Sequence, residues 1–589
     1  MVSRSSKKRF TKPAKKQTKT SAKQGKKRLA KRPGKRIEKT NNGHSDSHSQ
    51  EELSPRQKLV LEKAAAIRRR ENISYISSVV FVCGFIGLLA AMLIEPKLGI
   101  ALGTVLICLV LSFKYQRLAL YAFIIYVPFA GTVIYALGGN DLLQIAKDVF
   151  YIPALIGVYQ FCRKNRLPII LPKQLKIPLV ILLMVVVTTV LLTNVPDQLN
   201  GVGGKAPMMM ALLGLKILFG YVPLVACIYY LLRDKADLVG LLRIQTTLVL
   251  VACGLGLIQY IMLKTGTCAG TTGVGNEMFK ASLESRCFVG GSLLYSPDQG
   301  QIRLPGTFVA PWQWGWFLIS AAFFSFGTTF SDKSPFWRAV GLVSLVSVMV
   351  MSVLSGQRIA LALVPVAIVV LTVMTGQVTN LKRFIPVGVI LGFVLFYLAV
   401  SNPEVITART DSLISRWNAS PPHAFIAEQF EFVFKKQEGI FGHGLGRATN
   451  SARSFGETVL LETYHPKLIY EIGLPGLIAA LMVYTVMTVV TFRAYRGTKD
   501  KDLRSYAASM WVFVFFISYC PYYYPLDVDP VAVYYWLAAG IILKIPELER
   551  QEREKEAAMA QAALIESGAI EASTPSKSKH RRQNQPTFS

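Results

Sequence analysis

The chain has 589 residues, 52% of which are hydrophobic, and its mean hydropathy is +0.38. A soluble protein of this length would divide into several domains and would lack repeated uncharged segments long enough to cross a bilayer. Such segments fill residues 76–543 here, which excludes a soluble globular protein. The composition therefore predicts an all-α, polytopic integral membrane protein, with an unevenly distributed net charge of +31.

Residues 1–72 form a basic and polar segment before the first apolar run. Residues 1–40 hold 17 Lys and Arg residues and one acidic residue, Glu38. Residues 1–40 cannot bury enough apolar surface to fold alone, so we expect a disordered cytoplasmic tail that enforces topology. A clamp on anionic lipid head groups is the alternative. Nucleic-acid binding is not expected, because aromatic residues hardly interleave these charges, and no cleavable signal peptide is visible. After residues 1–40, Ser54 to Glu71 could form a short amphipathic helix that enters the membrane.

The apolar segments predict a transmembrane domain over residues 73–545 with about 12–14 helices. Several segments are shorter than the roughly 20 residues that a bilayer requires, so the count is given as a range. A cytoplasmic tail follows at 546–589 and begins as a charged helix, 547–564. The predicted spans are 76–94, 98–113, 118–137, 148–162, 177–193, 209–231, 238–264, 307–330, 339–354, 359–377, 384–401, 467–491, 505–520 and 530–544.

Basic residues alternate along this domain as the positive-inside rule requires. With the N-terminus in the cytoplasm, every inner loop contains Lys or Arg, and the pattern returns the C-terminal tail to the cytoplasm. Two long loops, 264–306 and 402–466, then lie on the extracytoplasmic side. The inner loops are 114–117, 163–176, 233–237, 331–338, 378–383 and 492–504.

Eight cysteines occur, and six of them lie in apolar segments, where a small buried hydrophobic role is expected. Cys268 and Cys287 instead share the first outer loop, which is rich in glycine. Only this pair is placed to form a disulfide, which would imply an oxidising exterior. No cysteine spacing suggests a zinc site, and no metal is expected.

Two arginines lie at the predicted outer boundary of the membrane. Arg358, in the turn 355–358, is the only charged residue between Arg338 and Lys382, and Arg303 precedes a long uncharged run. Each could be a boundary residue whose guanidinium reaches the head groups. Alternatively, each faces the helix bundle and binds an anion. Two guanidinium groups suit a diphosphate, because each offers planar bidentate donors to phosphate oxygens.

His465 lies where the second outer loop re-enters the membrane. An imidazole accepts a proton near neutral pH, which suits a general base acting on a sugar hydroxyl, although a structural role is the alternative. Upstream, glycines in the segment 441–447 permit tight turns and close approach to a ligand. The predicted threading places Arg303, Arg358 and His465 on the same side of the membrane.

The segment from about 303 to 477 resembles the O-antigen ligase and polymerase superfamily. Arg416-Trp417 is similar to the Arg/Trp element that opens the family's outer loop. The order and spacing of the motifs, rather than any single motif, carry the resemblance. The other motifs are Arg303-Leu304-Pro305-Gly306-Thr307-Phe308, Ser355-Gly356-Gln357-Arg358, Gly442-His443-Gly444-Leu445-Gly446, and His465 followed by Glu471-Ile472-Gly473-Leu474-Pro475-Gly476.

The resemblance implies a metal-independent, inverting glycosyltransferase without a cofactor in a bacterial cytoplasmic (inner) membrane. Its donor would be a glycan linked to undecaprenyl diphosphate, and its acceptor a lipid or glycan on the periplasmic face. Arg303 and Arg358 would hold the diphosphate, and His465 would activate the acceptor hydroxyl, with His443 as a rival base. Further substrate-binding candidates are Arg409, Arg416, His443 and Arg447.

Three activities share this donor chemistry, and the sequence does not separate them. They are an O-antigen ligase that moves a polymer to lipid A core or another acceptor, a polysaccharide polymerase, and a protein O-oligosaccharyltransferase. A polysaccharide or lipid transporter is the alternative of another class. It would show ionisable residues at membrane depth, for which Lys147, Asp148 and Lys216 are candidates, and repeated halves with broken helices, which are not visible.

Overall fold

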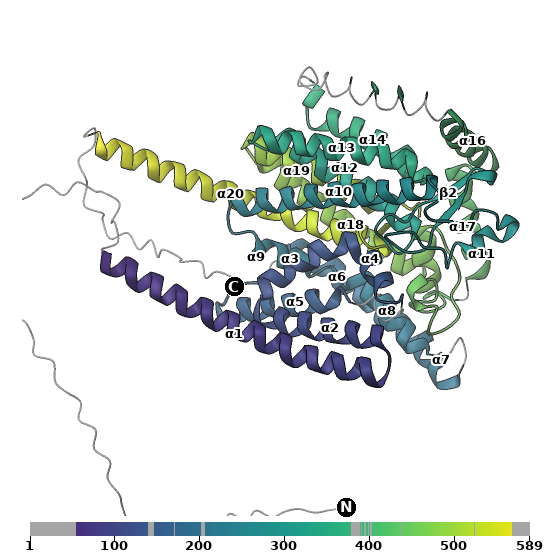
Figure 1. Ribbon diagram of the computed structural model, residues 1–589, viewed down its shortest axis with the longest axis horizontal. Helices are drawn as coiled ribbons and strands as arrows, with labels where there is room; N and C mark the ends of the chain where they lie inside the picture. Colours follow the sequence, from purple (N-terminus) through teal and green to yellow (C-terminus); the bar gives the residue numbers. More distant parts are fainter. Residues whose placement is uncertain are drawn as a thin grey trace, which may run out of the picture. The chain divides into compact units, whose positions relative to one another are not determined.

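A computed structural model describes most of the chain, and α-helices make up nearly all of its described secondary structure (Figure 1). The only named strands in these residues are the short pair β1 (Leu294–Ser296) and β2 (Gln301–Arg303), so the fold is all-α as predicted. The chain divides into two units, 1–60 and 61–589, and the described residues of the first, 55–60, begin α1. Described are residues 55–139, 146–169, 171–201, 206–378, 403–437, 439–523 and 525–567, with six single positions between 389 and 400.

Eight helical stretches among the described residues are long and apolar enough to span a membrane, and a bent pair of helices makes a ninth. The bent pair, α8 (Pro207–Phe219) and α9 (Leu224–Leu231), differs in direction by 41°. The chain is therefore a multi-pass membrane protein. The eight are α1 (Pro55–Leu93), α2 (Pro96–Lys114), α3 to α4 (Gln116–Tyr126, Ala130–Ala136), α6 to α7 (Lys173–Thr189, Val195–Asn200), α10 (Lys235–Lys264), α13 (Pro335–Leu354), α18 (Tyr464–Gly497) and α20 (Val531–Glu566).

The remaining helices are shorter or more polar. An apolar helix of 17 residues, α14, begins at Arg358 and ends at Met374. The predicted span 384–401 and most of the predicted loop 378–383 lie outside the described residues. The others are α5 (Asp148–Lys164), α11 (Met278–Ala281), α12 (Pro311–Ser331), α16 (Pro403–Ala419), α17 (Pro422–Lys436) and α19 (Lys501–Tyr519), with short 3-10 turns η1 (Val127–Phe129), η4 (Gly275–Glu277), η5 (Pro297–Gln299), η7 (Asn450–Ala452) and η8 (Pro525–Asp527), and a π-helical turn η3 (Val190–Asn194).

Helix α12 lies at the centre of the unit that spans 61–589. It packs against α10, α13, α14 and α19, and almost all of its side chains are buried. Figure 1 shows α10, α12, α13 and α14 side by side. The aromatic side chains of α12 supply much of the contact with its neighbours, and the fully buried Trp314, Trp316 and Phe317 occupy the first turns of this helix. Burying such large rings contributes strongly to packing energy, so the first turns of α12 are a rigid platform.

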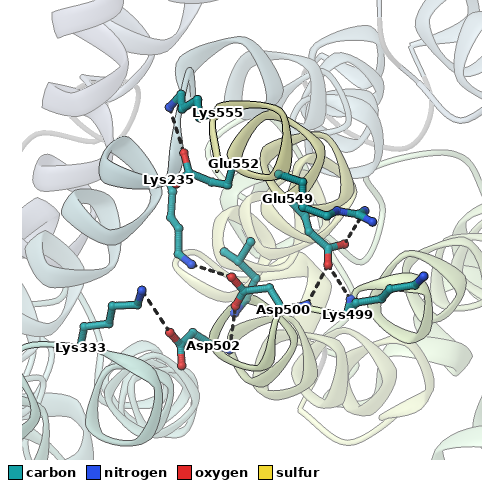
Figure 2. Close-up of polar contacts among 10 residues, drawn as sticks. Lys235, Lys333, Lys499, Asp500, Asp502, Glu549, Glu552 and Lys555 are labelled. Carbon is teal, nitrogen blue, oxygen red and sulfur yellow. Dashed lines mark hydrogen bonds and ion pairs between the residues drawn. The ribbon is translucent and has the colours of Figure 1, made fainter. Parts of the chain in front are cut away.

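The turns between helices fall into two groups, one at each end of the bundle. Ion pairs join Arg117 to Asp237 at 2.7 Å and Lys235 to Asp500 at 2.8 Å. Figure 2 shows the second of these pairs beside Lys333, which reaches toward Asp502. We call the end of the bundle where these ion pairs lie the basic end. It contains the turns 114–117, 163–176, 231–237, 331–338 and 497–504.

The other ends of the same helices form what we call the loop end. It contains residues 127–139, 146–148, 194–201, 206–207, 264–310, 355–358, 437, 439–466, 520–523 and 525–530. The five described loops that the positive-inside rule groups together thus lie at one end, and both predicted long loops meet the other. Helices that alternate in direction are enough to produce this result, because each span carries the chain from one end of the bundle to the other.

Candidate functional site

Arg303 ends β2 on a ribbon that several contacts hold in place. β1 and β2 pair antiparallel, with Leu294 opposite Arg303. Cys268 and Cys287, the pair expected from the sequence, are joined by a disulfide in the same segment. The side-chain amide of Gln259, on α10, donates hydrogen bonds to the carbonyls of Cys287 and Val289 at 3.0 and 2.6 Å. The Arg303 side chain is exposed, and its guanidinium lies 5.6 Å from the centre of the Phe279 ring.

The turn that carries Arg358 lies against this ribbon. The backbone N–H of Leu304 donates to the carbonyl of Ser355 at 3.0 Å. Gly356 has φ of +69°, and a Cβ atom there would overlap the carbonyl oxygen of Ile302. Only glycine allows this approach, because it tolerates positive φ and carries no side chain. Arg358 follows as the first residue of α14 and is half-buried.

His465 is the second residue of α18, and the turn 521–527 fixes its position. Thr463 forms an antiparallel bridge with Tyr522, and the N–H of Tyr464 donates to the carbonyl of Pro521 at 2.6 Å. One helical turn on, Lys467 forms an ion pair with Asp527 at 2.5 Å, and both side chains are almost fully buried. Burial raises the pKa of Asp527 to about 6, although the nearby Lys467 ammonium opposes the rise.

The first turns of α12 bring these segments together. Gly315 lies against the side chain of Gln357, next to Arg358. The indole N–H of Trp316 donates to the carbonyl of Tyr523 at 3.2 Å. In turn, the N–H of Tyr523 donates to the carbonyl of Glu462 at 2.9 Å, three residues before His465. The segments of Arg303, Arg358 and His465 are thus linked around residues 314–316, and we call this arrangement the candidate site.

Buried polar atoms without partners occur in several parts of the described chain, and four of them lie in these segments. Within the described part of the chain they include the indole nitrogen of Trp314, the amide nitrogen of Gln357, the hydroxyl of Thr463 and Nε2 of His465. All four residues belong to the segments that meet at the candidate site. Buried polar atoms nearly always have a hydrogen-bond partner, so unpartnered ones need an explanation. These four atoms therefore have hydrogen-bonding capacity that the described protein does not use.

The glycine-rich turn 442–446 has a different environment. The N–H groups of His443 and Gly444 donate to the carbonyls of Tyr470 and Glu471 at 2.8 and 3.2 Å. The N–H of Leu445 donates to the Asn194 side chain at 2.9 Å, and that amide returns a bond to the Leu445 carbonyl at 3.0 Å. The sequence suggested that these glycines allow a ligand to approach. In the structure, backbone atoms of α18 and of Met210 and the side chains of Thr193 and Asn194 occupy that space.

Two further candidate residues from the sequence, His443 and Arg447, contact protein groups around this turn. Nε2 of His443 lies 2.7 Å from the carbonyl oxygen of Lys436, and its ring stacks on Tyr470 with centres 4.3 Å apart. Arg447 is 8% exposed and forms an ion pair with Asp197 at 2.5 Å. Arg409 and Arg416 belong to α16, but their side chains lie outside the described residues.

Two acceptors that sequence reasoning gave no role hold the glycine-rich turn. Asn194 is fully buried at the end of η3, where a π-helical turn reorients the backbone. Glu471 is 3% exposed, and its carboxylate accepts hydrogen bonds from the N–H of Ala448 at 2.8 Å and the hydroxyl of Thr449 at 2.9 Å. A single carboxylate inside the apolar run 466–492 was the available signal for Glu471. Asn194 had no comparable signal, because it follows an ordinary apolar helix.

Comparison with models of known protein families gives no match for the chain, and no curated protein matches it either. The function is therefore argued from the chemistry of the site and from the sequence motifs.

Proposed function

We propose that the chain is a membrane glycosyltransferase of the O-antigen ligase type. It would move a glycan from an undecaprenyl-diphosphate carrier to a lipid or glycan acceptor on the extracytoplasmic face of a bacterial inner membrane. One observation carries the proposal: the segments bearing Arg303, Arg358 and His465 meet around the first turns of α12, although up to about 160 residues of chain separate them.

The chemistry uses only protein groups. The guanidinium groups of Arg303 and Arg358 bind the diphosphate of the donor. The acceptor hydroxyl oxygen attacks the anomeric carbon while the bond from that carbon to the phosphate oxygen breaks, and the configuration inverts. His465 accepts the hydroxyl proton, and the electron pair of the broken bond leaves with the diphosphate. The arginines stabilise the negative charge that develops there.

The arrangement of charges and cysteines supports an extracytoplasmic site. The disulfide between Cys268 and Cys287 lies at the loop end, and disulfides persist in oxidising compartments. Basic turns occupy the opposite end, which the positive-inside rule assigns to the cytoplasm together with both termini. If α5, α12, α14 and α19 also span, the described helices give thirteen spans with the bent pair. The predicted span 384–401, outside the described residues, would make the even number that both termini on one side require.

A transporter would use ionisable residues at membrane depth to bind and release its cargo. The three such residues noted in the sequence are held in ion pairs: Lys216 with Asp148, and Lys147 with Asp529. These pairs bring α5 against α8 and against the turn that precedes α20. Their role in joining helices makes the glycosyltransferase the better supported function.

The proposal can be tested with Arg358→Ala and His465→Ala variants in the native host. We expect both proteins to insert at normal levels and to lose transfer of the lipid-linked glycan, by a factor of about 10²–10⁴ for the loss of a general base. Arg453→Ala and His423→Ala are matched controls, because both residues lie on the second outer loop and outside the candidate site. Normal transfer by both site variants would contradict the assignment.

The same strains separate the three related activities. Loss of a ligase leaves long lipid-linked polymer to accumulate, whereas loss of a polymerase leaves single repeat units. Loss of a protein O-oligosaccharyltransferase removes glycan from proteins instead. Extraction of the lipid-linked fraction, followed by mass measurement of its glycans, distinguishes these outcomes.

A further inference from the structure

We propose that the turn between α5 and α6 is a binding site for the head groups of anionic phospholipids. The chain has five basic residues between Arg163 and Lys176 and no acidic residue. All five basic side chains are exposed. Within the part of the chain that the structure describes, none of them forms an ion pair with a carboxylate.

The backbone holds three of these cations close together. Arg163 and Lys164 end α5, and Arg166 follows in a left-handed conformation with φ of 52°. A residue with a side chain pays roughly 1–2 kcal/mol for that conformation. The turn is nevertheless closed by a hydrogen bond from the N–H of Leu167 to the carbonyl of Cys162 at 2.8 Å. Three like charges within four residues also repel one another, so a bound anion would offset both costs.

The α18–α19 turn at the basic end contains carboxylates that pair with basic residues. The turn between α18 and α19 places Asp500 and Asp502 among its basic residues, and Lys235 and Lys333 pair with them (Figure 2). The buried carboxylate of Glu549 accepts hydrogen bonds from the N–H groups of Lys499 and Asp500 at 2.8 and 2.7 Å. The α5–α6 turn therefore differs from the α18–α19 turn in having five basic residues and no carboxylate among them.

The surroundings of the α5–α6 turn favour a lipid over a soluble anion. Helices α1, α2 and α6 are the most exposed of the spans, with 17%, 22% and 28% of their apolar windows buried, against 56% for α18 and 83% for α20. Tyr159, one turn before the basic residues on α5, is 52% exposed. The hydroxyl of Tyr230 donates to the carbonyl of Pro168 in the turn itself. Tyrosines at this level are typical of the membrane interface, where basic side chains meet anionic head groups.

The site can be measured without any glycan-transfer assay. Full-length protein would be purified in mild detergent and mixed with phosphatidylglycerol or with phosphatidylethanolamine of the same acyl chains, and bound lipid counted by native mass spectrometry. The test variant is Arg163→Gln/Lys164→Gln/Arg166→Gln. The matched control is Arg493→Gln/Arg496→Gln/Arg504→Gln, which removes three exposed charges from the α18–α19 side of the same end. The basic N-terminal tail is present in all three proteins.

We expect the test variant to retain about fivefold less phosphatidylglycerol than wild type or control, since each basic residue near an anionic head group contributes to binding. Binding of phosphatidylethanolamine should not change, and millimolar inorganic phosphate should not displace the lipid. Equal retention by the test variant and wild type, equal loss in both triple variants, or displacement by phosphate would overturn the proposal. If the triple variant inserts poorly, Arg166→Gly provides a second test. It relieves the positive φ, so the protein should be at least as stable as wild type and still bind less phosphatidylglycerol.

Discussion

The glycine-rich turn 442–446 and the start of α18 belong to one continuous region, yet their polar groups are satisfied to different degrees. In the turn, the N–H groups of His443, Gly444 and Leu445 all donate to protein acceptors. At the start of α18, the Thr463 hydroxyl and Nε2 of His465 are buried without partners in the described residues. The turn is complete as folded protein, whereas the start of α18 has hydrogen-bonding capacity left for a ligand.

The comparison shows that the backbone donors of a conspicuous sequence motif can be fully used in protein packing. Glycines at alternate positions predicted tight turns that a ligand could approach closely, but here they allow the turn to pack on α8 and α18. The residues with unsatisfied groups come from three separate segments and form no local motif. If this distinction holds, variants of the turn should change stability, and variants of the α18 start should change activity.

The largest effect on stability is expected for Gly473→Ala. Gly473 interrupts α18 with φ of 72° and ψ of 178°, a conformation that is essentially restricted to glycine. An added Cβ would also overlap the carbonyl oxygen of Ile440, which leads into the glycine-rich turn. Together these costs should reach about 3 kcal/mol or more. Yield of monodisperse protein and the melting temperature in detergent measure the loss.

Gly439→Ala is the matched control for this prediction. Gly439 has φ of +78°, but a Cβ there would meet no atom within 4 Å. Only the conformational cost of about 1 kcal/mol then applies. Equal destabilisation by both variants would show that the close packing of the turn against α18 contributes little.

An intermediate, pH-dependent effect is expected at Asp527. Burial raises the pKa of its carboxyl to about 6 from an ordinary 3.8, with Lys467 opposing the rise and Glu471 adding to it. As the pH rises, this carboxyl loses its proton in the unfolded chain before it does in the folded protein. The contribution of the group to the free energy of unfolding is therefore greatest below about pH 4. It falls as the pH rises to about 6. Melting temperatures of wild type and Asp527→Asn across this range should diverge in slope, and parallel curves would exclude the shift.

The positions of the helix ends were the most predictable part of the fold. A bilayer forces long uncharged runs and basic flanking residues, so the turns at 114–117, 163–176 and 331–338 were visible in the sequence. The local geometry of the helices was not predictable in this way. The predicted span 209–231 is bent at Gly220–Pro223, and α20 continues without interruption from Val531 to Glu566 where two helices were expected. Hydropathy changes at residue 546, but charged residues can continue a helix beyond the membrane as well as apolar ones.

For the candidate site, the sequence identified the ionisable residues but not their supports. Arg303, Arg358 and His465 are conspicuous because charges are rare in apolar surroundings. Asp527 and Asn194 contact Lys467 and Leu445, which are 60 and 251 residues away in the chain. Such pairs are set by tertiary packing and leave no periodic pattern in one sequence. The glycine-rich turn was correctly identified as tightly folded, but its partners could not be predicted for the same reason.

The smallest effect on stability is expected for His465→Gln. A direct comparison of this variant with His443→Gln is the sharpest test of the difference between the start of α18 and the glycine-rich turn. Nε2 of His465 has no partner within the described residues, so its replacement should cost less than about 1 kcal/mol. His443 stacks on Tyr470 and contacts the Lys436 carbonyl, so its replacement should cost about 1–2 kcal/mol. Transfer of lipid-linked glycan should show the opposite order, with a loss of about 10²–10⁴-fold for His465→Gln and near-normal activity for His443→Gln. A reversal, in which His443→Gln is inactive but stable, would move the proton acceptor to the glycine-rich turn and would mean that unpartnered atoms do not mark the site.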